Sequence, residues 1–136
     1  MHAQATWIKD NQIELETKGH AFVTDVCKEE AGQHCPPSAV DFLTASFAGC
    51  VAYFISKALR NRGAEPKGLT VKVSADYAEA PHRIGSFKVE VELPEGLPEP
   101  LRAAAQRAAE GCTIHNTLTH PPEVRFEYHA HPLAAV

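Results

Sequence analysis

The sequence contains no C-x-x-C pair, although four cysteines stand at positions 27, 35, 50 and 112. The most specific sequence signature of a zinc site is therefore missing. The N-terminus also lacks the basic-then-apolar pattern of an export signal, so we expect a cytoplasmic protein. Because thiols are usually kept reduced there, we interpret the cysteines as core residues, redox groups or ligands rather than as a disulfide framework. For Cys27 and Cys35 we favour inert positions in a loop.

An excess of positive charge is also missing, because the formal net charge is -4 at pH 7. The charge balance gives no reason to expect nucleic acid or an anionic membrane as a partner. We find no internal repeat and no low-complexity tract. The length of 136 residues and the 44% hydrophobic content are typical of a soluble globular protein, and we predict a single domain over residues 1–136.

Charge of either sign is absent between Asp41 and Lys57. This interval belongs to residues 38–62, which we predict to form one long buried helix. Ser38 and Asp41 have the spacing of a capping box at its start, and Gly63 follows its end. The apolar run is too short, and too closely bracketed by charges, for a membrane span of about 20 residues.

Alternation of apolar and polar residues predicts antiparallel strands on both sides of this helix. The predicted elements, in chain order, are strands at 3–8, 11–17 and 20–26, the long helix, strands at 69–77 and 84–93, a helix at 99–110, a helical turn at 112–118 and a strand at 123–129. We interpret 27–37 as a loop and the tail from His131 as loose. The order βββαββαβ indicates an α+β fold, with antiparallel sheets packed on the long central helix.

The predicted central helix carries more apolar surface than one small sheet can cover. An exposed remainder of that kind is unusual in a soluble monomer. We therefore predict a homodimer in which the surplus apolar surface forms the interface. Gly49, directly before Cys50, is small enough to let another element approach the helix closely.

Cys50 and Cys112 occupy special places in this scheme. Cys50 lies in the middle of the long helix, and Cys112 lies at the break between two helices, where free backbone N–H groups favour a thiolate. The helix motif Ala48-Gly49-Cys50, together with Cys112-Thr-Ile-His-Asn116 and the following Pro121-Pro122-Glu-Val124, resembles the OsmC/Ohr family. That family comprises the osmotically inducible proteins and the organic hydroperoxide resistance proteins, and the resemblance covers nearly the whole chain.

The resemblance implies an interwoven homodimer that defends the cell against oxidative stress, with two active sites at the interface and with neither metal nor cofactor. It also implies a peroxiredoxin-like hydroperoxide reductase that acts on organic hydroperoxides through redox-active cysteines. Cys50 matches the peroxidatic cysteine of the family and Cys112 its resolving cysteine. Attack of a thiolate on the peroxide leaves a sulfenic acid, which condenses with the second thiol to a disulfide. A dithiol reductant then restores both thiols.

The sequence departs from the peroxidases of that family at three places. Val40 stands where they carry a glutamate, Thr113 follows the second cysteine where they usually carry a proline, and no arginine precedes Arg60. Asp41, next to Val40, is the available carboxylate and a candidate catalytic residue, although a capping role explains it equally well. The alternative function is therefore an OsmC-like protein without peroxidase activity, which binds a small hydrophobic ligand in the pocket at the dimer interface.

Two further interpretations stay open at this point. A zinc-binding accessory protein is the third hypothesis, because several histidines lie near cysteines or near one another. Its candidate ligands are Cys112 with His115 and His120, the adjacent His34 and Cys35, and the alternating His129 and His131. The apolar residues Leu43, Phe47 and Phe54 are either core residues or the lining of a pocket for an alkyl chain.

Overall fold

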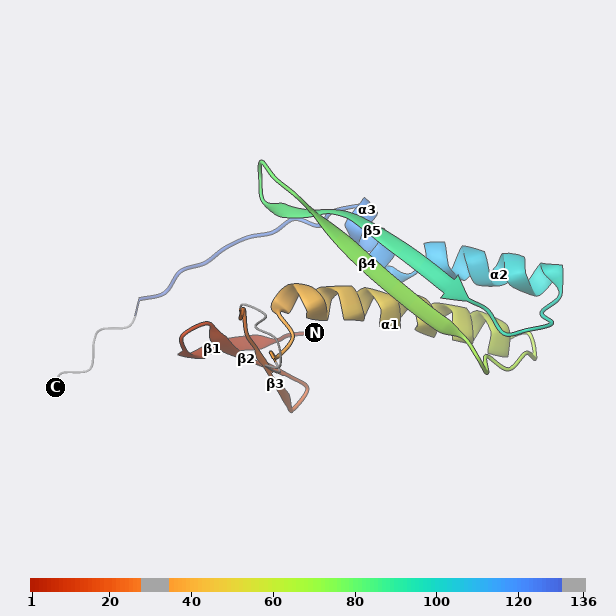
Figure 1. The fold of residues 1–136 in the computed structure, drawn as a ribbon, viewed down its shortest axis with the longest axis horizontal. Helices are drawn as coiled ribbons and strands as arrows, with labels where there is room; N and C mark the ends of the chain where they lie inside the picture. The colour runs from red at the N-terminus through yellow and green to blue at the C-terminus, as the bar shows by residue number, and fades with distance from the viewer. Residues whose placement is uncertain (28–34, 131–136) are drawn as a thin grey trace.

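The computed structural model describes residues 1–27 and 35–130 and confirms the predicted α+β class. Two antiparallel sheets and three helices follow one another along the chain (Figure 1). The elements are β1 (Gln4–Lys9), β2 (Gln12–Thr17), β3 (His20–Thr24), α1 (Ala39–Arg60), β4 (Thr70–Ala78), β5 (Arg83–Glu92), α2 (Glu99–Glu110) and α3 (Thr113–Thr119). Their bounds agree with the predicted ranges to within two residues, and the tail from His131 lies outside the described residues.

Strands β1, β2 and β3 form a three-stranded antiparallel meander. Its two turns place Asp10, Lys18 and Gly19 at positive φ, which reverses the chain within two residues each time. The three strands pair mainly with one another, while α1 packs most extensively against α2 and β4. A tilted ring contact between Phe22 of β3 and Phe42 of α1, with centroids 5.6 Å apart, joins the meander to the helix.

The predicted capping box opens helix α1. Asp41 donates its backbone N–H to the Ser38 hydroxyl oxygen at 3.2 Å, and the Asp41 carboxylate accepts from the Ser38 backbone N–H at 2.8 Å. The helix ends where Gly63 adopts a φ of 75°, a conformation that glycine adopts without strain. Four residues spaced one turn apart, Phe47, Val51, Ile55 and Leu59, form the buried stripe of the helix.

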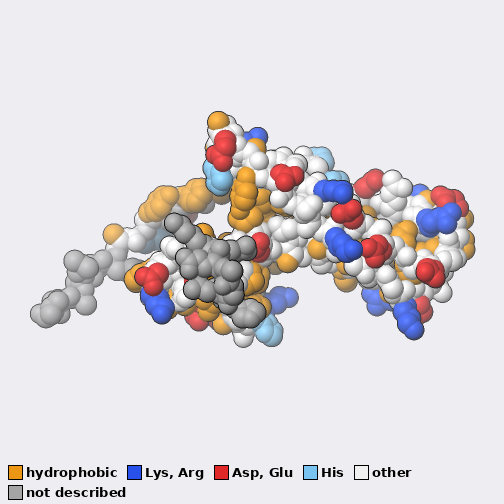
Figure 2. Space-filling model, in the orientation of Figure 1, with side chains coloured by type: hydrophobic (Ala, Val, Ile, Leu, Met, Phe, Trp, Pro, Cys, Tyr) orange, Lys and Arg blue, Asp and Glu red, His pale blue; other side chains and the backbone are white. Residues whose placement is uncertain are grey.

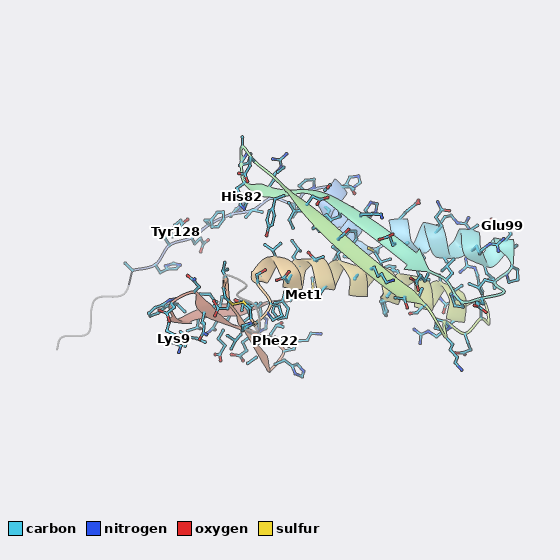
Figure 3. The ribbon with its side chains drawn as sticks, in the orientation of Figure 1. Met1, Lys9, Phe22, His82, Glu99 and Tyr128 are labelled. Carbon is cyan, nitrogen blue, oxygen red and sulfur yellow. A yellow bond between two sulfur atoms is a disulfide. The ribbon has the colours of Figure 1, made fainter. Side chains whose placement is uncertain are left out.

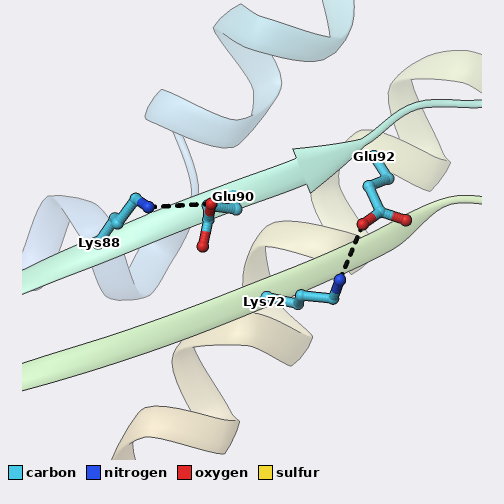
Figure 4. A network of polar contacts seen from close by, with 4 residues as sticks. All are labelled: Lys72, Lys88, Glu90 and Glu92. Carbon is cyan, nitrogen blue, oxygen red and sulfur yellow. Dashed lines mark hydrogen bonds and ion pairs between the residues drawn. The ribbon is translucent and has the colours of Figure 1, made fainter.

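Strands β4 and β5 form a hairpin that lies along α1 (Figure 1). Its inner face packs alternate apolar residues of both strands against the buried stripe of α1, namely Val71, Val73, Phe87, Val89 and Val91. The outer face is charged, with ion pairs between Lys72 and Glu92 at 2.8 Å and between Lys88 and Glu90 at 3.0 Å (Figure 4). One apolar and one charged face is the pattern of a sheet covered on one side only.

Helix α2 lies beside α1 and buries Ala104 and Ala105 against the common core. Gly111 then ends α2, and the chain enters the short helix α3 with Cys112 at its N-cap position. Small alanine side chains allow the close approach of α2, and the core is therefore built from one stripe of α1, the inner face of the hairpin and one face of α2.

The predicted final strand at residues 123–129 is not formed. This segment runs away from the helices without pairing to any strand of the described chain (Figure 1). Val124, Phe126 and Tyr128 are 69%, 77% and 89% exposed. The alternation of the sequence is that of a strand, but a strand also needs a neighbouring edge for its backbone hydrogen bonds, and this chain places none beside the segment.

Large apolar side chains remain exposed over much of the molecule. Figure 2 shows orange side chains gathered along the C-terminal segment and beside the charged body of the protein. Exposed large apolar residues include Trp7 and Phe22 of the meander, Leu43 and Tyr53 of α1, Tyr77 of β4, Leu118 of α3, and Phe126 and Tyr128 of the C-terminal segment. Within the described residues of one chain, the fully buried side chains of α1 are those of the stripe that faces the hairpin and α2, and apolar surface of the helix remains exposed, as predicted.

By length and composition α1 resembles a membrane-crossing helix, since it has 22 residues and a mean hydropathy of 1.5 over its most apolar window. Its buried stripe nevertheless packs against β4 and α2 in the core of the protein. The opposite face of the β4–β5 hairpin, away from α1, is charged. These contacts identify α1 as the core helix of the fold.

Candidate dithiol site

Helix α1 and the start of α3 bring Cys50 and Cys112 together. Cys112 is fully buried within the hydrophobic core, and the half-buried Cys50 packs against the same cluster. The Cys50 side chain lies near enough to Cys112 to raise the pKa of its thiol. A sequence separation of 62 residues is thus closed by packing α1 against the junction of α2 and α3. Both cysteines are free thiols in the structure.

The Cys112 sulfur caps helix α3. It accepts the backbone N–H of His115 at 3.3 Å, as a short side chain at an N-cap position can do. Burial raises the pKa of Cys112 above its ordinary value. The nearby Cys50 thiol also raises this pKa, whereas the hydrogen bond from the His115 backbone N–H lowers it. Backbone N–H groups therefore favour the Cys112 thiolate, as predicted, but the buried site penalises the charged form more strongly and the net pKa is raised.

The His115 ring does not face the thiols. Its Nδ1 atom contacts the Glu110 carbonyl oxygen, and its plane stacks on Phe47 with centroids 6.5 Å apart. Phe47 in turn meets Phe87 edge to face at 5.3 Å. His115 therefore acts on Cys112 through its backbone, and its ring closes one end of an aromatic layer above the core.

An apolar cavity of about 390 Å³ lies over this aromatic layer. Helices α1, α2 and α3 and strand β5 all contribute to its wall, with Phe47, Val51, Phe87, Val89, Ala109, Glu110, His115, Leu118 and Thr119. Neither thiol lines the cavity. Cys50 and Cys112 belong to the same packed cluster as the cavity-lining residues Phe47 and Val51. Of the three apolar residues predicted for a pocket, only Phe47 lines it.

Asp41 lies away from the two thiols in its own chain. It precedes Cys50 by nine residues on one helix, which corresponds to about 13 Å along the axis. Its carboxylate accepts from both the backbone N–H and the hydroxyl of Ser38, at 2.8 and 2.7 Å. Hydrogen bonds from Ser38 lower the pKa of Asp41 below its usual value. The structure thus places Asp41 in the cap of α1.

The metal hypothesis finds no geometric support in the part of the chain that the structure describes. Within residues 1–27 and 35–130, no three side chains of His, Cys, Asp or Glu gather in a metal-binding arrangement. His115 and His120 follow Cys112, but their Nδ1 atoms contact carbonyl oxygens of Glu110 and Asn116 instead of converging on the sulfur. His34 and His131 lie outside the described residues.

Cys27 and Cys35 form a disulfide, with Cα atoms 6.1 Å apart. The prediction that both are inert, reduced loop residues is therefore wrong. The end of the meander and the Pro36-Pro37 segment before α1 bring their Cα atoms within the usual range for a bridge. The expected compartment predicts reduced cysteines, but it does not determine which cysteine side chains the fold places next to each other.

The chain thus combines a mixed α+β fold with two neighbouring free thiols, of which Cys112 is buried and Cys50 is half-buried. A family model described as OsmC-like protein matches residues 31–127, and the chain therefore belongs to the OsmC family. Membership supports a redox or stress-related role. A search of curated protein sequences finds no match.

Solved structures confirm the fold at low sequence identity. An OsmC-like protein from Mycoplasma pneumoniae superposes with a TM-score of 0.75 at 12% identity, over 88% of this chain and 87% of the other. A candidate osmotic stress induced and detoxification response protein from Psychrobacter arcticus gives 0.74 at 19% identity, over 85% of each chain. An organic hydroperoxide resistance protein OsmC from Legionella pneumophila gives 0.59 at 19% identity, over 86% and 87%.

Proposed function

We propose that the protein is a thiol-dependent peroxidase that reduces organic hydroperoxides, with Cys50 as the nucleophile and Cys112 as the resolving thiol. The observation that carries the proposal is the proximity of the two free thiols, one half-buried and one fully buried, in the same hydrophobic cluster. A disulfide between them requires Cα atoms within about 7 Å of each other. Family membership and the hydroperoxide resistance protein from Legionella pneumophila add support for this chemistry.

The reaction balances with these two residues and one external reductant. The Cys50 thiolate attacks the peroxide oxygen, the O–O bond breaks, and the alcohol leaves after taking up a proton, which gives Cys50 sulfenic acid. The Cys112 sulfur then attacks the Cys50 sulfur, water leaves, and a disulfide forms. A dithiol returns two electrons and two protons in two exchange steps and is itself oxidised to a disulfide. Neither metal nor organic cofactor enters this scheme.

The apolar cavity suits the carbon chain of such a substrate. Its volume of about 390 Å³ lies within the range of small-molecule pockets, and aromatic and aliphatic side chains supply most of its wall. Phe47 and Val51 line the cavity, and neither thiol does, although all four residues belong to the same packed cluster. We therefore propose that a hydroperoxide places its alkyl part in the cavity and reaches Cys50 along the exposed side of α1.

We further propose that the protein acts as a cytoplasmic homodimer. The uncovered face of α1, the meander and the C-terminal segment each expose large apolar residues, and three such surfaces on one chain are unusual for a soluble monomer. The catalytic role predicted for Asp41 requires this dimer, because Asp41 reaches no thiol of its own chain. The domain itself is proposed to span residues 1–136.

Turnover of cumene hydroperoxide with dithiothreitol as reductant tests the proposed activity. We expect the wild-type protein and the Cys27→Ser/Cys35→Ser double variant to consume the peroxide, and Cys50→Ser to lose at least about a hundredfold in rate. Equal consumption by wild type and Cys50→Ser would overturn the assignment of the nucleophile.

The same cavity favours a second function, the binding of a small hydrophobic ligand without peroxidase activity. Its lining is largely apolar and excludes both thiols, and Val40 stands in place of the glutamate of the peroxidases. In this case the protein would bind a hydrophobic dye, would lose that binding in Phe47→Ala, and would keep all free thiols after addition of cumene hydroperoxide.

A further inference from the structure

We propose that the Cys27–Cys35 disulfide is a second redox site, reversibly reduced by small dithiols, and that it tethers the meander to helix α1. The two cysteines are eight residues apart and lie between β3 and α1. They belong to neither the core cluster nor the dithiol site described above. The proposal does not depend on the reaction of Cys50 and Cys112.

Accessibility is the first argument for a reducible bridge. Cys27 is exposed and Cys35 is half-buried, whereas Cys112 is fully buried. Thiol–disulfide exchange requires a thiolate to reach one of the sulfurs directly, so exposed bridges are the labile ones. Both cysteines also line a hollow of about 720 Å³ that Tyr77 and His82 border from the β4–β5 hairpin, which leaves room for a small dithiol.

The position of the bridge is the second argument. On one side, Asn11 donates its side-chain N–H to the carbonyl of Val26 at 3.1 Å, and this bond fixes the residue before Cys27 to the turn between β1 and β2. On the other side, Cys35 is followed by Pro36-Pro37 and then by Ser38, the N-cap of α1. Proline fixes φ, so the short step from Cys35 to the helix is stiff.

The meander has few other anchors on the rest of the chain. Among the described residues its three strands contact mainly one another, and a ring pair of Phe22 and Phe42 links it to α1. Figure 3 draws the bridge as a yellow bond beside the meander, close to the start of α1. Opening the bridge therefore removes the covalent cross-link between meander and helix and leaves the non-covalent contact of Phe22 with Phe42.

The exchange chemistry balances with a dithiol alone. One thiolate of the dithiol attacks the Cys27 sulfur, the bond to the Cys35 sulfur breaks, and Cys35 leaves as a thiolate that takes up a proton. The second thiol of the reagent then attacks the first sulfur of the reagent, which is bonded to Cys27 in the mixed disulfide, and releases Cys27 as a thiol. The bridge gains two electrons and two protons, and the dithiol is oxidised to its disulfide. In a reducing compartment such disulfides are usually transient and redox-sensing.

Differential alkylation tests the redox site. The oxidised protein is titrated with dithiothreitol, alkylated with N-ethylmaleimide and digested. Trypsin places Cys27 in residues 19–28 and Cys112 in 108–125, and chymotrypsin after Phe42 or Phe47 separates Cys35 from Cys50. We expect Cys27 and Cys35 to become alkylated together while the circular dichroism spectrum is unchanged and Cys112 stays unlabelled. A bridge that opens only as the protein unfolds, or thiols that do not re-form it with oxidised dithiothreitol, would overturn the proposal.

Two controls separate this site from the dithiol site and test the tether. Cys50→Ser should show the same titration of Cys27 and Cys35 even if it reduces no hydroperoxide. On reduction, backbone amides of β1, β2 and β3 should exchange hydrogen about tenfold faster, while those of β4 and β5 keep their rates. The Cys27→Ser/Cys35→Ser variant should show the faster rates without reductant. Unchanged exchange in the meander would overturn the tether.

Discussion

The buried Cys112 sulfur accepts the backbone N–H of His115 at 3.3 Å, and the half-buried Cys50 thiol lies near enough to raise the pKa of Cys112. The N-terminus of α3 and burial in the core thus shift the pKa of the Cys112 thiol in opposite directions. Burial outweighs the hydrogen bond and raises the pKa of Cys112 above its ordinary value of 9.0. Because the thiolate is the attacking species, the proposed resolving step is limited by deprotonation at neutral pH.

This pKa predicts the pH dependence of disulfide formation. After one equivalent of cumene hydroperoxide, the rate of closing the Cys50–Cys112 bond should rise about tenfold per pH unit from pH 7 and continue to rise beyond pH 9.0. Rapid quenching with acid at pH 7, 8 and 9, followed by mass spectrometry, measures the rate. A rate that levels off below pH 9 would contradict the raised pKa.

Asp41 predicts a pH-dependent contribution to stability. Replacing it by Ala removes half of the capping box and should cost about 0.5–2 kcal/mol in the free energy of unfolding at pH 7. Since the folded protein lowers the pKa of this carboxyl, its contribution is present above the usual value of 3.8 and is lost as pH falls through the lower folded value. Urea unfolding of wild type and Asp41→Ala should therefore differ most at pH 7, and the difference should shrink as pH falls below 3.8.

A similar difference between the two proteins at pH 3 and pH 7 would show that the charge of Asp41 does not stabilise the helix start. Asp41→Asn is the matched variant, because it keeps an acceptor oxygen but no charge. If Asp41→Ala folds normally yet abolishes peroxide turnover in the dimer, the predicted catalytic role of Asp41 is supported. Unchanged turnover in Asp41→Ala would restrict the residue to capping.

Gly49 gives a test of the proposed interface. A Cβ atom at this position would meet nothing within 4 Å in the single chain. In an isolated monomer, Gly49→Ala should therefore raise the free energy of unfolding by about 1 kcal/mol through helix propensity. In the proposed dimer, a second subunit packs against this small residue, and we expect Gly49→Ala to weaken association instead.

Light scattering over a range of concentrations measures the association. Lys57→Ala is the control, because it changes an exposed position of the same helix outside the uncharged stretch. We expect Gly49→Ala to dissociate at concentrations where Lys57→Ala remains dimeric. A wild-type protein that scatters as a monomer of 14.8 kDa at all concentrations would contradict the homodimer.

For the C-terminal segment we predict that a polar substitution lowers thermal stability in a dimer but not in a single chain. Phe126 is 77% exposed, so Phe126→Ser should leave the stability of a monomer nearly unchanged. If the segment pairs with a second subunit as the missing strand, the substitution should instead lower the thermal midpoint by several degrees. Glu123→Gln, a neutralising change in the same segment, should have little effect in either state, and calorimetry compares the three proteins.

Most of the fold could be predicted from the sequence, because residue alternation and helix capping favour the same elements that tertiary packing stabilises. The alternation of Val89 and Val91 with charged residues predicted the half-covered hairpin, and Ser38 with Asp41 predicted the start of α1. The strand at 123–129 failed for a physical reason, because alternation specifies two faces but not the edge that accepts the hydrogen bonds.

The site was predictable only in part. The resemblance identified Cys50 and Cys112, and the structure brings these thiols together, while their catalytic roles stay predictions. The raised pKa of Cys112 depends on burial by residues distant in sequence, which the sequence does not display. The Cys27–Cys35 bridge depends likewise on how the meander and α1 are joined.

Peptide mapping after a single turnover tests the dithiol chemistry most directly. The protein with Cys27 and Cys35 replaced by Ser, so that only two thiols remain, receives one equivalent of cumene hydroperoxide without reductant and is mapped under non-reducing conditions. We predict one Cys50–Cys112 disulfide per chain, and a stable Cys50 sulfenic acid when Cys112 is also replaced by Ser. Two unmodified thiols after complete mixing would contradict the proposed peroxidase.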